Sequence, residues 1–248
     1  MTEQSKNIQV ITYERWEHFK NNVGLDLFED GIFKRNRFLF RGQRKAEWDL
    51  VTSFDRIYHQ YDPGRKREIE SFLIREFREE IEDLEILPDS EDSIIPFAQH
   101  HGIPTRLLDW TLSPYVAAFF AFVNILFSED NSSHAAIWVL DTESSIWHEE
   151  LGVRIISPPR IGNIRLRNQQ GKFTLSKTPF ASLEKYVDQF DDAGTPLIQM
   201  LIPSRDVRKA YSELDLMGIN YSNLFPGPDG QAKSVLMRAT LQFSNGVQ

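Results

Sequence analysis

The 248-residue sequence contains no cysteine. That absence excludes a disulfide framework, a thiolate zinc site and a cysteine nucleophile, and it is typical of proteins from a reducing compartment. The first residues lack the basic and apolar regions of a secretory signal. The apolar run from Tyr115 to Phe127 is shorter than the roughly 20 residues that span a bilayer. We therefore expect a cytoplasmic protein with no membrane partner.

The sequence also lacks the short motifs that mark common cofactor and catalytic sites. It contains no G-x-G-x-x-G, no Walker A loop, no G-x-S-x-G and no H-E-x-x-H. Rossmann-type and P-loop nucleotide binding, a serine hydrolase and a zinc protease are therefore disfavoured, and no metal is expected. No internal repeat, low-complexity segment or Gly/Ser-rich linker divides the chain, so we expect one domain.

Charge is distributed unevenly along an acidic chain. The net charge of −8 argues against general binding to duplex nucleic acid. Residues 79–92 carry no Lys or Arg, whereas residues 153–172 and the segment around Arg41 are basic. The basic runs are either a solvated surface or a local site for an anion, and the sequence leaves both interpretations open.

Hydrophobic periodicity predicts helices and strands without regular βαβ repeats. Helices are expected at residues 13–22, 65–87, 114–127, 205–217 and 230–242, the last capped by Asp229. Strands are expected at residues 37–43, 135–141, 152–157, 171–175 and 196–203. This pattern predicts an α+β fold in a single domain. We expect a mixed or antiparallel sheet core, a buried central helix at about 114–127 and flanking amphipathic helices.

Polar residues gather directly before the predicted central helix, in "QHHGIPTRLLDWTLSP", residues 99–114. Ser113 and Pro114 are a cap and first-turn pair, so the helix should begin there. Arg106, Asp109 and Thr111 would then lie near free backbone N–H groups, which attract phosphate or carboxylate. The alternative is that Arg106 and Asp109 form a structural salt bridge that fixes the turn.

The paired residues His100 and His101 allow more than one role. Adjacent side chains point in different directions, and no further ligand stands at a metal-binding spacing. A structural or hydrogen-bonding role is therefore favoured over a metal site. The alternative is that one of them acts as a general base or holds a substrate hydroxyl.

Several stretches together resemble the FRG domain family, whose name corresponds here to Phe40, Arg41 and Gly42. They are "FLFRGQ", "WDL", "QHHGIPTRLLDWTLSPYVAAFFA", "RNQQGKF" and "GINYSNLFPGPDGQA", which extend from about Phe38 to about Lys233. The resemblance implies an FRG domain at residues 37–248, with residues 1–36 as a helical extension packed on it. Members of this family look like bacterial and phage-associated proteins, some of them in defence contexts.

The motif order is also similar, more distantly, to that of ADP-ribosyltransferases. That similarity implies that Arg41 contacts the phosphate or ribose of NAD, and that Thr111 or Ser113 lies near the ligand. These enzymes place a glutamate on a later strand, where this chain has Gln169 and Gln170. A glutamine keeps the hydrogen bond but loses the negative charge that stabilises an oxocarbenium-like transition state.

Two functions follow from these resemblances. The first is an NAD-using ADP-ribosyltransferase or NAD glycohydrolase that acts as a toxin or anti-phage effector, with a protein or nucleic-acid acceptor. The second is a sensor that binds a nucleotide-like anion in the same pocket without chemistry. The catalytic candidates are Asp109, His100, His101 and Gln170, and the ligand-binding candidates are Arg41, Gly42, Gln43, Gln99, Arg106, Thr111, Ser113 and Arg167. Oligomeric state is not predicted.

Overall fold

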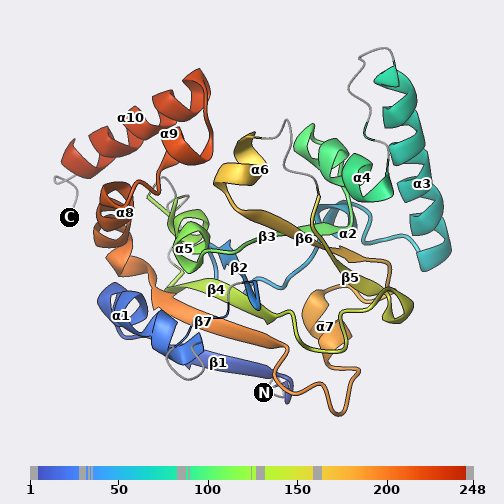
Figure 1. Ribbon diagram of the computed structural model, residues 1–248, viewed down its shortest axis with the longest axis horizontal. Helices are drawn as coiled ribbons and strands as arrows, with labels where there is room; N and C mark the ends of the chain where they lie inside the picture. The colour runs from blue at the N-terminus through green and yellow to red at the C-terminus, as the bar shows by residue number, and fades with distance from the viewer. Residues whose placement is uncertain are drawn as a thin grey trace.

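The computed structural model describes residues 5–27, 32, 34, 36–82, 88, 90–123, 125–126, 132–158 and 164–243. They form an α+β fold around one mixed seven-stranded sheet, as the sequence predicts (Figure 1). The strand order is β1-β7-β4-β2-β3-β6-β5. The strands are β1 (Ile8–Thr12), β2 (Phe38–Gln43), β3 (Leu107–Thr111), β4 (His134–Asp141), β5 (Val153–Ile156), β6 (Gly171–Ser176) and β7 (Leu197–Pro203). β1 pairs with β7 in parallel, and the other described pairings are antiparallel.

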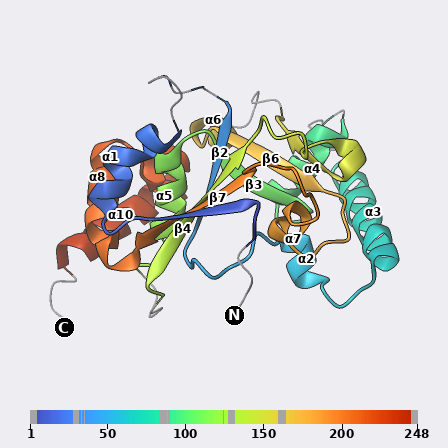
Figure 2. The ribbon, with the colours of Figure 1, turned by 90° about the horizontal axis from the view of Figure 1, so that it is seen from below.

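The helices fall into two groups at opposite ends of the sheet, as both views show (Figures 1 and 2). One group contains α1 (Trp16–Leu27), α8 (Val207–Leu216), α9 (Tyr221–Leu224) and α10 (Pro228–Phe243). The other contains α2 (Ser53–Ile57), α3 (Pro63–Glu80) and α4 (Glu91–His100). Between them lie α5 (Pro114–Phe122) and α6 (Ile164–Asn168), while α7 (Leu183–Val187) covers the opposite face of the sheet. None of the helices in the described ranges is long and apolar enough to cross a membrane.

The central helix α5 begins as predicted but ends earlier. The Ser113 hydroxyl accepts a hydrogen bond from the Val116 amide, and Pro114 occupies the first turn. Apolar side chains around this helix are buried against α1, α8 and strands β2 and β4. The expected end at residue 127 was wrong, because the helix stops at Phe122 and turns follow at Val123, Ile125 and Leu126.

The N-terminal segment is part of the same sheet. β1 is hydrogen-bonded to β7 from Ile8 to Thr12, and α1 follows it. The aromatic side chains Tyr13, Trp16 and Phe19 are buried in the core cluster that surrounds α5. Residues 8–27 therefore contribute both a strand and a helix to the domain that also contains the Phe-Arg-Gly tripeptide.

Several predicted boundaries need correction. Asp229 is a first-turn residue of α10 and not its cap, because Pro228 already begins the helix. α3 ends at Glu80, and residues 83–87 of the predicted helix lie outside the described residues. Strand β3 and helix α4 were not predicted. β3 is buried on both faces of the sheet except at Asp109, so apolar and polar residues do not alternate along the strand.

Candidate functional site

The backbone pairing between β2 and β3 is much shorter than that between β2 and β4. β2 pairs with β4 along all six of its residues, but within the described residues its pairing to β3 is the single pair Phe40 and Thr111. Beyond that pair the two strands diverge. The Arg41 side chain crosses the gap and its Nη1 donates a hydrogen bond to the Asp109 carbonyl at 2.9 Å. A side chain therefore makes the contact that a backbone amide makes elsewhere in the sheet.

A pocket of about 290 Å³ opens at this divergence. Its walls come from β2, β3, β6, α5, α6 and the loop after α9. The aromatic lining residues are Phe40, Trp110, Phe120, Phe173 and Phe225, and the polar ones are Arg41, Asp109, Thr111, Gln169 and Lys172. Flat apolar walls with few polar groups are typical of sites for small molecules that carry a planar ring.

Arg41 is the one arginine among the described residues that line the pocket. Its side chain is 19% exposed, and its Nε is buried without a hydrogen-bond partner. Burial lowers the pKa of Arg41, and the carboxylate of Asp109, 3.6 Å from Nη1, opposes that shift. A guanidinium has five N–H donors, and a buried donor without an acceptor is costly. The arrangement favours an anionic or hydrogen-bond-accepting ligand beside Arg41.

Asp109 is the acidic residue of the pocket. Its side chain is 64% exposed. The side-chain Nε2 of Gln99 on α4 donates to Asp109 Oδ1 at 2.8 Å, and the side-chain Oε1 of Gln99 accepts from the Thr105 hydroxyl. The carboxylate is thus oriented from α4 on one side and faces Arg41 on the other. The structure brings together Arg41, Gln99 and Asp109, three of the residues predicted for the site.

Gly42 lines the pocket, but helix packing explains why it is glycine. A Cβ atom at this position would lie 1.9 Å from the Ala117 carbonyl oxygen and 2.6 Å from the Ala121 nitrogen. α5 therefore packs directly on the backbone of β2, closer than any side chain allows. The Phe-Arg-Gly tripeptide combines a core residue, a pocket residue and a packing residue.

The later motifs form one wall of the pocket. The Thr111 hydroxyl donates to the Gln169 carbonyl, and Gln169 donates to the Leu224 carbonyl at 3.2 Å. Asn168 likewise donates to the Asn223 carbonyl at 2.6 Å. These bonds join the end of α6 to α9 and place Phe225 against the pocket. Phe120, Lys172 and Phe173, which the sequence reasoning did not assign to the site, lie within motifs that it had identified.

Other predicted site residues lie outside the pocket, or their polar groups already form hydrogen bonds within the fold. The amide of Gln43 accepts from Trp138 Nε1 and donates to the Asp49 carbonyl. The Ser113 hydroxyl is the helix cap described above. Arg106 lies under α3, where it contacts Glu70, and it is absent from the described lining. It therefore does not form the predicted salt bridge with Asp109.

His100, His101, Arg167 and Gln170 are also outside the described lining of the pocket. His101 packs on the Phe97 ring with 4.5 Å between centroids, and His100 packs edge-on against His101. Burial lowers the pKa of His100, and the charges of His101 and Arg165 lower it further. Gln170 adopts a left-handed backbone with φ of 50° at the turn into β6. Among the described residues no three His, Asp or Glu side chains gather as metal ligands.

The comparisons with known proteins identify one family. A family model of the FRG domain matches residues 36–130, the segment from β2 through α5 that contains Arg41, Gln99 and Asp109. The chain therefore contains an FRG domain. No match was found among curated proteins or solved structures.

Proposed function

We propose that this FRG domain protein binds a nucleotide-like anionic small molecule in the aromatic pocket, with NAD as the first candidate. The observation that carries the proposal is the guanidinium of Arg41, which faces this pocket with a buried Nε that has no hydrogen-bond partner. A phosphate or ribose oxygen in the pocket would accept hydrogen bonds from the accessible part of this guanidinium, and a phosphate would match its charge. Phe120, Phe173 and Phe225 offer flat surfaces for a base or nicotinamide ring.

The pocket size limits which part of a ligand it encloses. At about 290 Å³ it is at the lower end of the range for small-molecule sites, about 300–1,000 Å³. We therefore expect it to enclose one nucleotide unit, with the remainder of a dinucleotide outside. Asp109 would accept hydrogen bonds from ribose hydroxyls, because its carboxylate is exposed at the pocket and held by Gln99.

Cleavage of NAD is a second candidate function, and the position of Asp109 supports it. The bond between nicotinamide and ribose would break, and water or an acceptor would take the ADP-ribosyl group. A carboxylate stabilises the positive charge that develops on the ribose. However, Gln99 and Arg41 both contact this carboxylate and reduce its effective charge, which favours binding without turnover. A role as a toxin or anti-phage effector is a further proposal that follows from the resemblance alone.

Calorimetry with NAD, ADP-ribose and ATP tests the proposal, with nicotinamide release measured in the same mixtures. Arg41→Ala should weaken binding about 10- to 100-fold, the effect of losing one charge-assisted hydrogen bond. Arg167→Ala is the matched control, because Arg167 is an exposed arginine outside the pocket lining. Nicotinamide release that is lost in both Arg41→Ala and Asp109→Ala would establish cleavage. No binding of any of the three compounds would overturn the proposal.

A further inference from the structure

A row of hydrogen bonds connects the carboxylate of Asp109 to the buried side chain of Thr105. Asp109 Oδ1 accepts from Nε2 of Gln99 at 2.8 Å, and Oε1 of the same Gln99 amide accepts from the Thr105 hydroxyl. Thr105 is 1% exposed, whereas the Asp109 side chain is 64% exposed. The row therefore extends from the interior of the domain to the aromatic pocket, which Asp109 lines.

The donors and acceptors in this row fix the orientation of the Gln99 amide. A carboxylate only accepts hydrogen bonds, and a hydroxyl has a single hydrogen to donate. The Thr105 oxygen also accepts from the Leu107 amide at 3.4 Å, and its hydrogen is donated to Gln99 Oε1. With its oxygen held by Thr105, the Gln99 amide must direct its N–H group toward Asp109. Without the Thr105 hydroxyl, no side-chain donor would hold the amide in this orientation.

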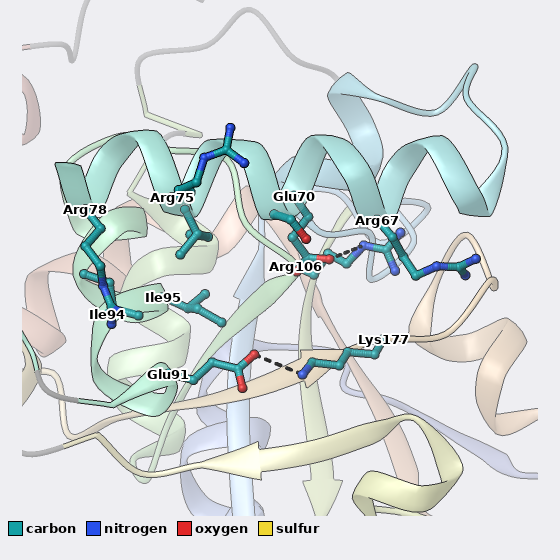
Figure 3. A pocket seen from close by; sticks show the side chains of 11 residues that line it. Arg67, Glu70, Arg75, Arg78, Glu91, Ile94, Ile95, Arg106 and Lys177 are labelled. Carbon is teal, nitrogen blue, oxygen red and sulfur yellow. Dashed lines mark hydrogen bonds and ion pairs between the residues drawn. The ribbon is translucent and has the colours of Figure 1, made fainter. Parts of the chain in front are cut away.

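Thr105 is itself held through its backbone. Its amide donates to the Ser53 hydroxyl, and its carbonyl accepts from that hydroxyl and from the Phe54 amide, each at 3.2 Å. The next residue, Arg106, lies 3.5 Å from the Glu70 carboxylate of α3, as Figure 3 shows. Helices α2 and α3 therefore fix the position from which Thr105 orients Gln99.

The charges around Asp109 restrict the ligand group that it can bind. A carboxylate accepts hydrogen bonds and repels phosphate. Arg41 and Lys172 are the other charged residues among the described lining residues, and both are cations, so a cationic ligand group is disfavoured. A neutral donor such as a hydroxyl group meets both conditions. In dinucleotide-binding folds a carboxylate accepts a hydrogen bond from a ribose hydroxyl in the same way.

We propose that Gln99 and Thr105 are positioning residues that make the pocket selective for ribonucleotides over deoxyribonucleotides. This inference rests on the proposed function and adds which sugar the pocket recognises. The two carboxylate oxygens have about four acceptor positions, so Asp109 can accept from Gln99 and from both neighbouring hydroxyls of a ribose. A deoxyribose lacks one of those hydroxyls. Gln99 holds the carboxylate in place for this contact, and Thr105 holds Gln99.

Calorimetry of the full-length chain with ATP and 2′-deoxy-ATP tests this inference. We expect ATP to bind about tenfold more tightly, which corresponds to one hydrogen bond to a charged group. The exposure of Asp109 keeps this ratio far below that of a buried polar site. Equal affinities for the two nucleotides would overturn the inference and leave nucleotide binding intact. Binding of neither would overturn the inference alone if NAD still bound, and the proposed function as well if NAD and ADP-ribose did not bind.

Three variants test the role of the Thr105 hydroxyl. Thr105→Val removes it at nearly constant size, and the affinity ratio should fall close to one. Thr105→Ser restores the hydroxyl and should restore the ratio. Thr174→Val is the matched control, because Thr174 is also 1% exposed but its hydroxyl accepts from Trp110 Nε1. Both nucleotides are measured on each variant, so a general loss of stability does not change the ratio. An unchanged ratio in Thr105→Val, or an equal fall in Thr174→Val, would overturn the inference.

Discussion

Arg41 lies on β2, and Arg106 directly precedes the neighbouring strand β3. The two guanidinium groups have different surroundings. Arg106 has Glu70 at 3.5 Å, Asp55 at 3.8 Å, the Thr178 carbonyl at 3.2 Å and the Phe54 ring beneath it. In the described part of the chain, the close polar partner of Arg41 is Asp109, through its carbonyl at 2.9 Å and its carboxylate at 3.6 Å. Neither Nε donates a hydrogen bond, but that of Arg106 lies beside a carboxylate.

The groups that surround a guanidinium distinguish a structural arginine from a candidate ligand-binding one. Two acids, a carbonyl and an aromatic ring surround Arg106, so its charge is balanced within the fold. Arg41 faces a cavity and shares one partly exposed acid with Gln99. The sequence analysis placed both residues among the ligand-binding candidates, and only their neighbours in the structure distinguish them.

Replacing each arginine by leucine should give the largest difference. Arg106→Leu removes a buried cation and leaves the Glu70 carboxylate, whose side chain is 20% exposed, without its partner. We expect it to lower the free energy of unfolding by about 3–5 kcal/mol. Arg41→Leu should cost less than about 1 kcal/mol, because the exposed Asp109 carboxylate remains hydrated. Urea denaturation measures both values. A cost for Arg41→Leu as large as that for Arg106→Leu would make Arg41 a structural residue.

Gly42→Ala separates packing from ligand binding within the Phe-Arg-Gly tripeptide. The added methyl group would overlap the Ala117 carbonyl and displace α5, and we expect it to lower the free energy of unfolding by about 3 kcal/mol. Gly194→Ala is the control, since its φ of 68° is strained for alanine but nothing lies within 4 Å of the new atom. It should cost about 1 kcal/mol. Similar costs for both would contradict the packing role of Gly42.

The smallest expected effect is the contribution of Glu70 to the pH dependence of the free energy of unfolding. Burial raises the pKa of Glu70 above its ordinary value, and the charge of Arg106 only partly opposes that shift. Between the unfolded and folded pKa values, the folded protein takes up a proton that the unfolded chain does not. The free energy of unfolding of the natural chain, relative to Glu70→Gln, should therefore increase as the pH falls from 7 toward the ordinary carboxyl range. A relative stability that decreases over this interval would contradict the raised pKa.

Local signals predicted the elements that depend on few residues. Ser113 and Pro114 marked the start of α5, and the helix predicted to end at residue 217 is α8, which ends at Leu216. β3 was missed because a short strand covered on both faces lacks alternation. α4 was missed because it contains Pro96 and begins in an acidic run.

The missed strand also explains the error at Arg106. The sequence places this residue seven positions before Ser113, close to the predicted helix start. Five of the intervening residues form β3, which extends the chain by about 16 Å. Arg106 is thereby carried to the α3 side of the molecule, while Asp109 and Thr111 stay at the pocket. Contacts across the sheet, such as that between Arg41 and Asp109, depend on strand order, which a single sequence does not contain.

The single residue pair between β2 and β3 has a mechanical consequence. A ladder of backbone hydrogen bonds resists shear along its whole length, whereas we expect one pair to act as a hinge between two blocks of the sheet. Arg41 belongs to one block and Asp109 to the other, and the hydrogen bond between them spans the hinge. A ligand that contacts both residues would clamp the two blocks together. We therefore expect occupancy of the pocket to stiffen the sheet as a whole.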